Sequence, residues 1–480
     1  MTRLTLLHTN DIHGRVNQLL RIAGMVKRIK REVAEEGGYC RYLDAGDAED
    51  TLLLESSLTR GTAMDAILKA SEADHVALGN AIPVRYGQQV IPDLAEWLGK
   101  PILCANLFDL SGVLQPGLEP YRIEQIGPLK VAWIGFTAQL VYYAPFFHLD
   151  ARDPVSLLPD LVREVRERGA KTVIVVSHIG SKKDIELAEL GLDVEVIIGG
   201  HDHKIIDPPL KVKDTLIVQT GDYGRFLGRL DLEVDDSSGK VTGFKGNLLP
   251  VTEDLPEDTG ALNAFHEQQA RAGRMMAVPV GVLEEPLELS STKECPAGDL
   301  LADALLDRVK DAEICLVMAG HWTCGLDAGT VTQGKLYAAL RSTGNPARVE
   351  MTGAEIERFL CKALRPHLDE RQLIRLRHNQ VGMPHIAGIE VVDGDVEEGW
   401  LTIVKNGEPL EPDRKYIIAT SDLEISEILD YFVVPLEKAQ FEMPTILPEV
   451  LEQYIQAHSP IAAPKDGRLA AHLFCKTGSV

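Results

Sequence analysis

The chain has 480 residues, more than a single hydrophobic core usually supports, so two or more domains are expected. Its formal net charge of −23 disfavours binding to nucleic acid or to an anionic membrane surface, because both would repel an acidic protein. Hydrophobic residues make up 45% of the chain, and no apolar run is long enough to predict a transmembrane helix.

The cysteines and the first residues of the chain bear on its location. The seven cysteines are scattered and form no Cys-x-x-Cys pair, which favours free, buried thiols over a disulfide framework. The chain opens with MTRLTLLHTND, which contains no apolar signal core. Both features predict a cytoplasmic protein.

Residues 1–250 alternate short apolar runs with helical patterns. Amphipathic helices are expected at Leu19–Glu35 and Val155–Arg168, where apolar residues recur every three or four positions. The alternation predicts an α/β layered domain in which helices cover largely buried sheets. The predicted strands are Leu4–Leu7, Tyr42–Asp44, His75–Leu78, Ile102–Ala105, Val131–Gly135, Thr172–Ser177, Val194–Ile198 and Thr215–Gln219.

The pattern changes after residue 250. The acidic, turn-rich stretch EDLPEDTG is followed by NAFHEQQARAGRMM, which is typical of a connecting helix, so residues 251–275 are expected to form a linker. A second α/β domain is expected over residues 276–480, with helices near Leu300–Lys310 and Ala354–Leu364.

Five loops that follow predicted strands carry residues able to bind metals. In open α/β sheets such loops gather at one edge, so their side chains can share one site. Any one of these segments alone is more often an ordinary turn, but five of them at strand ends indicate a metal centre. The residues are Asp11 and His13 in HTNDIHG, Asp47 in LDAGDAED, Asn80 in ALGN, His178 in VVSHIG, and His201 and His203 in IIGGHDH.

The residue types suggest which metals bind and what they do. Imidazoles together with carboxylates suit Mn, Zn, Fe or Co better than Ca or Mg alone, and a carboxylate such as Asp47 can bridge two cations. Two divalent cations about 3.5–4 Å apart can activate water and hold a phosphoryl group for displacement. The predicted chemistry is therefore phosphoester hydrolysis.

With these motifs the sequence resembles the 5′-nucleotidase family of calcineurin-like metallophosphoesterases, which includes UDP-sugar hydrolases and 2′,3′-cyclic phosphodiesterases. The resemblance covers nearly the whole chain. It implies an N-terminal metallophosphoesterase β-sandwich flanked by helices and a C-terminal 5′-nucleotidase-type α/β domain. It also implies two sets of metal ligands that share Asp47: Asp11, His13, Asp47 and His203 for one metal, and Asp47, Asn80, His178 and His201 for the other.

One catalytic position departs from the family pattern. The family's Gly-Asn-His motif reads Gly79-Asn80-Ala81 here. In the family this histidine is thought to protonate the leaving group or steady the phosphate, and Ala81 has no group that can do either. General acid catalysis is typically worth about 10²–10⁴-fold in rate. Arg85 in the same loop and His321 in the second domain are the candidate replacements; the alternatives are a solvated surface charge for Arg85 and a pocket-filling role for His321.

The second domain resembles the family in its framework but not in its substrate-binding segments. The segments ECPAGDLLADA, GTVT and EMTGAE follow the family pattern. However, Met318 and Thr323 replace the family's asparagine and phosphate-reading arginine, and Leu423 replaces the phenylalanine that would stack on a nucleobase. Because a base clamp needs flat aromatic faces, the usual nucleobase recognition is not expected. Trp322 and Tyr431 are possible substitutes, although packing roles are favoured for both.

The leading hypothesis is a metal-dependent phosphoester hydrolase that uses a metal-bound hydroxide on a nucleotide or related phosphoester. Its expected partner is a small anionic substrate, with no nucleic-acid polymer and no membrane. The alternative is a catalytically weakened or inactive metal-binding relative with a binding or regulatory role. The replacements at Ala81, Thr323 and Leu423 favour this alternative.

Overall fold

The fold is taken from a computed structural model that describes residues 1–50, 53–141, 143–365, 375–376, 379–427, 435, 438–464 and 467–474. The chain divides into two compact units, residues 1–272 and 273–480, and the division falls within helix α8 (Thr259–Met276). Within the described residues, no helix is both long enough and apolar enough to cross a membrane.

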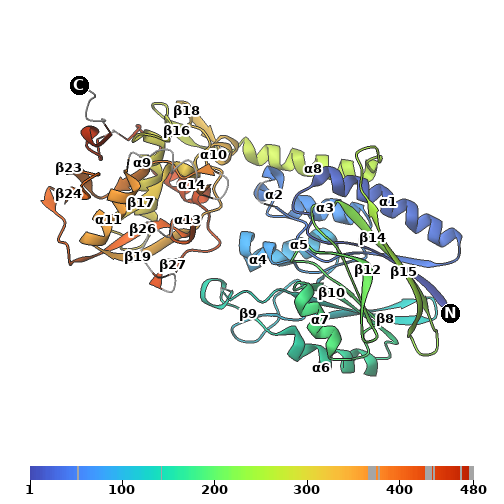
Figure 1. Ribbon diagram of the computed structural model, residues 1–480. Coiled ribbons are helices and arrows are strands. Elements are labelled where there is room, and N and C mark those ends of the chain that lie inside the picture. Colours follow the sequence, from blue (N-terminus) through green and yellow to red (C-terminus); the bar gives the residue numbers. More distant parts are fainter. Residues whose placement is uncertain are drawn as a thin grey trace. The chain divides into compact units, whose positions relative to one another are not determined.

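The first unit is built on two stacked β-sheets, shown in Figure 1. Apolar side chains from both sheets, including Leu6, Trp133 and Val176, are buried between them and form one core. The five-stranded sheet has the order β15 (Val241–Pro250), β14 (Phe226–Val234), β1 (Thr2–Thr9), β2 (Tyr39–Asp44) and β3 (His75–Val76). The six-stranded sheet has the order β12 (Ile205–Val212), β13 (Thr215–Thr220), β11 (Val196–Ile198), β10 (Thr172–His178), β8 (Leu129–Thr137) and β7 (Tyr121–Ile126).

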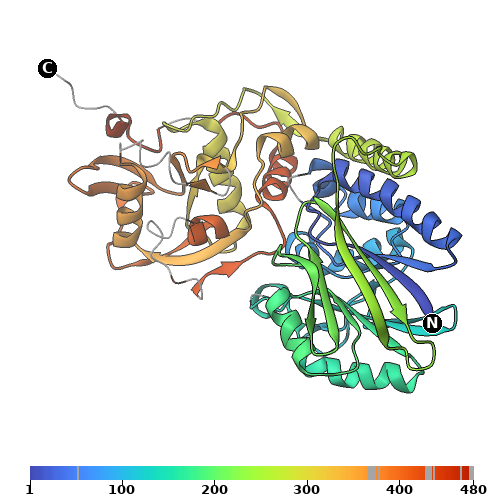
Figure 2. The same ribbon diagram turned by 45° about the vertical axis from the view of Figure 1, so that its right-hand side comes forward.

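Helices cover the outer faces of this sandwich (Figure 2). Helix α1 (Val16–Glu35) packs against β2 and against α3 (Thr62–Ala70), which in turn contacts α5 (Ile91–Leu98). On the opposite side, α6 (Pro154–Glu167) and α7 (Ser181–Glu189) bury apolar residues against the six-stranded sheet. The shorter elements are α2 (Leu54–Leu58), α4 (Ala81–Tyr86), η1 (Gln88–Val90), β4 (Ile102–Leu103), β5 (Leu107–Asp109), β6 (Leu118–Glu119), η2 (Tyr143–Phe147) and β9 (Leu149–Ala151).

Local sequence explains where these helices begin. Asp153 precedes α6, and its carboxylate accepts a hydrogen bond from the Val155 backbone N–H, while Pro154 occupies the first helical position. Both are preferred at helix N-termini because the first backbone N–H groups have no partner within the helix. Helix α1 buries Leu19, Ala23 and Val26, at the spacing that places them on one face.

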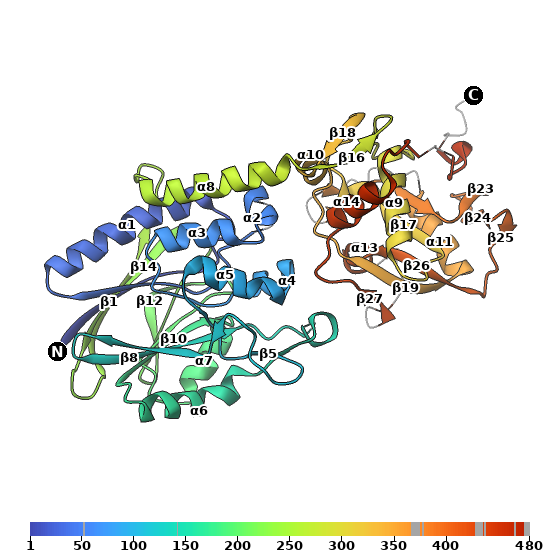
Figure 3. The ribbon, with the colours of Figure 1, turned by 180° about the vertical axis from the view of Figure 1, so that it is seen from behind.

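The second unit is built around one five-stranded sheet, drawn in yellow to red in Figure 3. Its order is β22 (Pro384–Ala387), β17 (Ile314–Met318), β26 (Lys415–Ser421), β19 (Pro346–Thr352) and β27 (Gln440–Phe441). Helices α9 (Pro296–Arg308) and α14 (Leu447–His458) pack on one face, and α11 (Gly353–Ala363) packs on the other. The remaining elements are β16 (Pro279–Leu283), η3 (Ala319–His321), β18 (Gly329–Thr332), α10 (Gln333–Ala339), β20 (Arg375–Leu376), β21 (Asn379–Gln380), β23 (Glu390–Asp395), β24 (Trp400–Lys405), β25 (Glu408–Pro409), α13 (Asp422–Glu427) and η5 (Ala471–Phe474).

The α/β fold class expected from the sequence is confirmed, and each predicted strand has a counterpart in the structure. Three counterparts are shorter than predicted, since β3 ends at Val76, β4 ends at Leu103 and β11 begins at Val196. After Val76, an isolated bridge joins Ala77 to Leu103. The regular pairing of β3 therefore ends where the loop toward Asn80 begins. The apolar run in the sequence continues past this point and does not reveal the end of pairing.

A partly buried ion pair connects the two sheets of the first unit. Arg41 on β2 donates hydrogen bonds to the Glu124 carboxylate on β7, with Nε 3.0 Å from Oε1, and His75 Nε2 lies 3.5 Å from Oε2. Burial alone would raise the pKa of Glu124, but the hydrogen bonds from His75 and Arg41 and the arginine charge lower it to about 2. The charged form of Glu124 is therefore favoured in the folded state.

We expect Glu124→Gln to lower the free energy of unfolding by about 1–2 kcal/mol at pH 7. Because folding lowers this pKa, the stabilisation is present above the ordinary value near 4.5 and is lost as the pH falls toward about 2. Denaturant unfolding at pH 7 and pH 3 measures the difference, with Asp160→Asn in the exposed pair with Arg163 as a control without effect. A loss that is the same at both pH values would contradict this account.

Candidate metal centre

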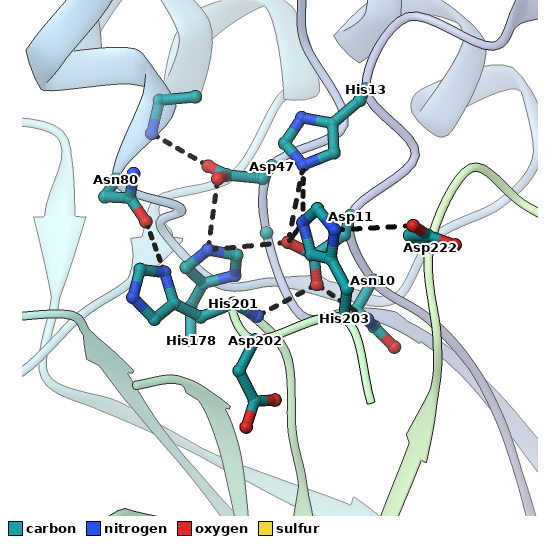
Figure 4. A network of polar contacts seen from close by, with 12 residues as sticks. Asn10, Asp11, His13, Asp47, Asn80, His178, His201, Asp202, His203 and Asp222 are labelled. Carbon is teal, nitrogen blue, oxygen red and sulfur yellow. Dashed lines mark hydrogen bonds and ion pairs between the residues drawn. The ribbon is translucent and has the colours of Figure 1, made fainter. Parts of the chain in front are cut away.

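The loops after five strands of the first unit bring all seven predicted ligands into one region, shown in Figure 4. Strands β1, β2 and β3 run parallel, as do β10 and β11, so their carboxyl ends lie at common edges. His178 is the last residue of β10, and the other six residues lie in loops directly after their strands. The loop residues are Asp11 and His13 after β1, Asp47 after β2, Asn80 after β3, and His201 and His203 after β11.

Asp11 lies at the centre of this region and is fully buried. Its Oδ2 accepts hydrogen bonds from Asn10 Nδ2 at 2.7 Å and from the His201 backbone N–H at 2.9 Å. Its Oδ1 has no hydrogen-bond partner and lies 3.6 Å from His13 Nε2 and 3.4 Å from His203 Nε2. Burial alone would raise the pKa of Asp11, but the histidines and Asn10 hold it well below its usual value, so the carboxylate is charged.

His178 and Asp47 form the adjoining part of the site. The His178 Nδ1–H donates to the Ala45 carbonyl oxygen at 2.7 Å, which turns Nε2 toward Asp47 Oδ2, 3.2 Å away. Asp47 Oδ1 accepts a hydrogen bond from the Ala81 backbone N–H at 2.8 Å. Although burial lowers the pKa of His178, the charges of Asp47 and Asp11 raise it to about 9. Two carboxylates therefore face this ring and favour its protonated, positively charged form.

The chemistry of these donors fits divalent metal ions. Asp11 Oδ1 and His178 Nε2 are buried polar atoms without hydrogen-bond partners, and such atoms are costly unless a ligand or ion satisfies them. The hydrogen bond from His178 Nδ1 to a backbone carbonyl is the arrangement that orients metal-binding histidines in proteins. Two groups of donor atoms, Asp11–His13–His203 and Asp11–Asp47–His178, each lie within 4.8 Å of one another.

Asn80 and His201 extend the second group. His201 Nδ1 lies 2.7 Å from Asn80 Oδ1, so the two side chains meet beside Asp47 and His178. The geometry places Asp11 in both donor groups, whereas the family resemblance implies that Asp47 is the shared ligand. The assignment of individual ligands to two metals therefore stays a prediction.

The backbone at the site is strained in a way that supports a binding role. Five of the seven residues are non-glycine residues with φ in the left-handed region, a conformation that costs of order 1–3 kcal/mol each. They are Asp11 (φ 51), His13 (φ 46), Asp47 (φ 56), His201 (φ 84) and His203 (φ 57). Such strain persists where the surrounding structure fixes it, and here it turns the side chains toward a common space.

The glycine at position 79 is required by the position of Asp47. A Cβ atom at residue 79 would lie 2.0 Å from Asp47 Oδ1, far inside van der Waals contact. Only glycine allows the Gly79–Asn80 loop to pass this close to the carboxylate.

Two neighbours of the site were not singled out from the sequence. Asn10 donates to Asp11, and Asp222 Oδ2 lies 3.4 Å from His203 Nδ1, on the ring nitrogen away from the site. Asp222 could have been predicted from the sequence, because it follows the end of strand β13 in the same way that the predicted ligands follow their strands. Asn10 lies inside the HTNDIHG motif, next to Asp11.

The two candidate replacements for the missing histidine have different surroundings. Arg85 lies on α4, the short helix that follows Asn80, and is partly exposed. His321 in the second unit is only 1% exposed, and its ring nitrogens lie 2.7 Å from Ser342 Oγ and 2.7 Å from Glu424 Oε1. Both ring nitrogens of His321 thus have partners within its own unit, and its role stays a prediction.

The substrate-binding segments of the second unit are also engaged internally. The Thr323 hydroxyl donates to the carbonyl oxygens of Ala338 and Ala339, at 2.8 and 3.0 Å. Leu423 and Trp322 are buried in apolar cores of this unit. Tyr431 lies outside the described residues.

Comparisons with known proteins agree with this fold. Residues 279–432 match the family described as 5′-nucleotidase, C-terminal domain. An uncharacterised metallophosphoesterase of Bacillus subtilis, YunD, is 23% identical over 457 residues, covering 94% of this chain and 98% of the relative. The trifunctional nucleotide phosphoesterase YfkN of the same organism is 26% identical over 434 residues, covering 81% of this chain and 29% of the relative.

Solved structures share the fold over both units. NAD nucleotidase of Haemophilus influenzae aligns with a TM-score of 0.62 at 18% identity, covering 98% of each chain. A 5′-nucleotidase precursor from Thermus thermophilus aligns with a TM-score of 0.54 at 23% identity, covering 97% of this chain and 99% of that one.

A two-sheet sandwich with clustered metal-binding side chains, joined to a 5′-nucleotidase C-terminal domain, defines the class as metallophosphoesterase. The sequence motifs had pointed to the 5′-nucleotidase family, and residues 279–432 match the C-terminal domain of that family.

We expect Gly79→Ala to weaken the binding of Mn²⁺ about tenfold or more, because the added Cβ forces Asp47 or the Asn80 loop out of place. Isothermal titration calorimetry of the metal-depleted protein measures the affinity. Gly273→Ala is the matched control, since a Cβ there meets nothing within 4 Å. Equal affinities of Gly79→Ala and the wild type would show that Asp47 does not take part in binding.

Proposed function

We propose that this chain is a hydrolase of small phosphoesters, nucleotides or closely related compounds, with two divalent metal ions, Mn, Zn, Fe or Co, at the site around Asp11. The observation that carries the proposal is the pair of buried, unpartnered donor atoms, Asp11 Oδ1 and His178 Nε2, in a set of seven converging donor side chains. When bound, such ions lower the pKa of water and neutralise charge on a phosphoryl group.

The protein's own part in this chemistry is to hold and orient these groups. Asp11, His13 and His203 would hold one ion, and His178, Asn80 and His201 the other, with Asp47 between them. Hydrogen bonds from Asn10 to Asp11 and from His178 to Ala45 fix the donors before any substrate arrives. Asp222 beside His203 Nδ1 orients that ring in the same way.

Ala81 limits which substrates are hydrolysed well. Its backbone N–H is bound to Asp47, and its methyl group cannot donate a proton to a leaving group. Substrates whose leaving groups need no proton, such as esters of acidic alcohols or phenols, are therefore favoured. The residues that would hold the metals, rather than a side chain at position 81, would therefore support the reaction.

Base recognition differs from the pattern that the family resemblance implies. The buried Leu423 offers no stacking surface, and the Thr323 hydroxyl is occupied by backbone carbonyl oxygens. These contacts support a substrate that is held mainly through its phosphoryl group. Its negative charge would be matched by the metals rather than by the acidic protein surface.

We also propose that the protein works in the cytoplasm, without a nucleic-acid or membrane partner, and takes part in nucleotide breakdown. The cytoplasmic location is supported by the cysteines that the structure describes, which are free thiols, five buried and one exposed. The net charge of −23 supports the lack of a nucleic-acid or membrane partner.

We expect the wild type with added Mn²⁺ to hydrolyse p-nitrophenyl phosphate and bis(p-nitrophenyl) phosphate, and Asp47→Asn to lower kcat/KM about 100-fold or more. Release of p-nitrophenolate measures the rate. The exposed Asp160→Asn serves as a control for the loss of one carboxylate. Equal rates for the wild type and Asp47→Asn would exclude the proposed site.

The variant Ala81→His separates the proposal from its alternative, a metal-binding protein without turnover. Restoring the histidine should raise hydrolysis of an alkyl phosphate monoester about 10²-fold or more, whereas hydrolysis of the activated aryl diester should change little. A wild type that binds metal but hydrolyses neither aryl substrate would favour the alternative.

A further inference from the structure

A second cluster of reactive groups lies in the second unit, among residues that the metal chemistry does not use. Cys295 Sγ lies 3.6 Å from His385 Nε2, and the Nδ1–H of the same ring donates to Asp299 Oδ1 at 2.8 Å. All three side chains are buried, and Asp299 Oδ2 has no hydrogen-bond partner. A thiol, an imidazole and a carboxylate in this order form the arrangement that activates cysteine nucleophiles.

The fold builds this cluster from two packed elements. Cys295 caps the N-terminus of helix α9, and Asp299 lies in the first turn of that helix. His385 lies on β22, which packs directly on α9. A Cβ atom at residue 298 would lie 2.2 Å from His385 Cδ2, so Gly298 is what allows the imidazole to rest on the first turn of the helix.

The electrostatics of the cluster favour a thiolate. Burial raises the pKa of the other buried thiols, to about 12 for Cys104 and about 11 for Cys361. Burial acts in the same direction on Cys295, but the hydrogen bond and charge of His385 outweigh it and lower the pKa of this thiol. Burial would lower the pKa of His385, yet Asp299 and Cys295 raise it to about 9.

The proton transfer that makes the thiolate conserves net charge. Moving the proton from sulfur to Nε2 turns a neutral pair into an ion pair beside the Asp299 carboxyl group. The partial positive charge of the α9 N-terminus stabilises the sulfur anion further.

Among the described residues, the other polar groups near the cluster have partners of their own. The Ser290 carbonyl oxygen lies 3.6 Å from Sγ and accepts a hydrogen bond from the protonated thiol. Glu294 accepts from the backbone N–H groups of Gly467 and Arg468, both at 2.9 Å. The Arg468 guanidinium pairs with Asp303 at 2.7 Å. Neither Glu294 nor Arg468 is therefore free to replace His385 as the partner of the thiol.

The cluster lies next to an exposed stretch of the chain. Cys295 is 2% exposed, but residues 291–293, just before it in the chain, are exposed. Its sulfur lies 3.6 Å from the carbonyl oxygen of Ser290, the residue that leads into this exposed stretch. A local opening of this segment would give a small molecule such as hydrogen peroxide access to the sulfur.

We propose that Cys295 is a modification site, a thiolate held by His385 and Asp299 that small peroxides oxidise to sulfenic acid. The sulfur attacks one oxygen of hydrogen peroxide, so that an S–O bond forms and the O–O bond breaks. Sulfur loses two electrons and the peroxide gains them. The departing hydroxide takes the proton from the His385 imidazolium and leaves as water. This site does not depend on the metal centre or on the proposed hydrolase activity.

Alkylation with iodoacetamide tests the thiolate. The full chain carrying Cys324→Ser, which removes the one exposed thiol among the described cysteines, is labelled at pH 6 and pH 8.5, and Cys295 is quantified by peptide mass spectrometry. A thiolate held by His385 should react at rates within about threefold at the two pH values, whereas an ordinary thiol slows roughly a hundredfold at pH 6. His385→Gln should restore the steep dependence, and His458→Gln, on the exposed end of α14, should not.

The ultraviolet absorbance of the thiolate near 240 nm gives a second readout that needs no access to the sulfur. At pH 6 it should be present in the Cys324→Ser protein and absent after the further change Asp299→Asn or His385→Gln, with circular dichroism checking that each variant is folded. Absence of this band in the parent protein at pH 6, or a hundredfold slower alkylation there, would overturn the ion pair.

Peroxide itself tests the modification. After treatment with hydrogen peroxide at pH 6, the sulfenic-acid reagent dimedone should label Cys295 in the folded Cys324→Ser protein and not in its His385→Gln variant. Buried Cys104 and Cys361 are internal controls that should stay unlabelled. If Cys295 is labelled no more than these two cysteines, it is not a peroxide-sensitive site.

Discussion

The first unit is organised around a buried carboxylate that hydrogen bonds only half satisfy. Asp11 Oδ2 is held by Asn10 and by a backbone N–H, while Oδ1 faces the nitrogens of His13 and His203 without a partner. A buried charge of this kind is costly unless a cation compensates it. The strained backbone of the surrounding loops, the close approach at Gly79 and the ordered ring of His178 all serve to keep such a cation site in shape.

The sequence predicted that the candidate metal-binding residues come together, because their chemical types and their positions after strands point to the same site. The ligand residues follow apolar strands, and parallel strands end at a common edge, so Asp47 and His178 could be expected to meet although 131 positions separate them. Boundaries were harder, because the apolar run after Val76 continues beyond the last paired residue. The strand pairing also places Arg41 and Glu124 on different sheets, and their contact depends on how the sheets stack, which no local pattern encodes.

The same limit applies to the second unit. The sequence made His321 a candidate general acid, and it gave no indication that Cys295 and His385 lie close together. In the folded chain His321 is enclosed by Ser342 and Glu424, while Cys295 and His385 meet across 90 positions because β22 packs on α9. Motif comparison finds residues at expected positions, but contacts between a helix N-terminus and a neighbouring strand appear only when the elements are packed.

The two sites rest on one physical principle, a charge held in a buried place by oriented partners. In the first unit the partners are carboxylates and imidazoles that favour a cation, and in the second an imidazole and a helix N-terminus favour an anionic sulfur. The replacement of the family's histidine by Ala81 removes a proton donor but keeps the contact with Asp47, since the backbone N–H of residue 81 makes that hydrogen bond.

The stoichiometry of metal binding tests the central claim most directly. Calorimetric titration of the metal-depleted protein with Mn²⁺ should give two ions bound per chain, and Asp11→Asn should abolish tight binding because Asp11 belongs to both donor groups. A wild type that binds no metal, or an Asp11→Asn variant that binds two ions as tightly as the wild type, would contradict the account.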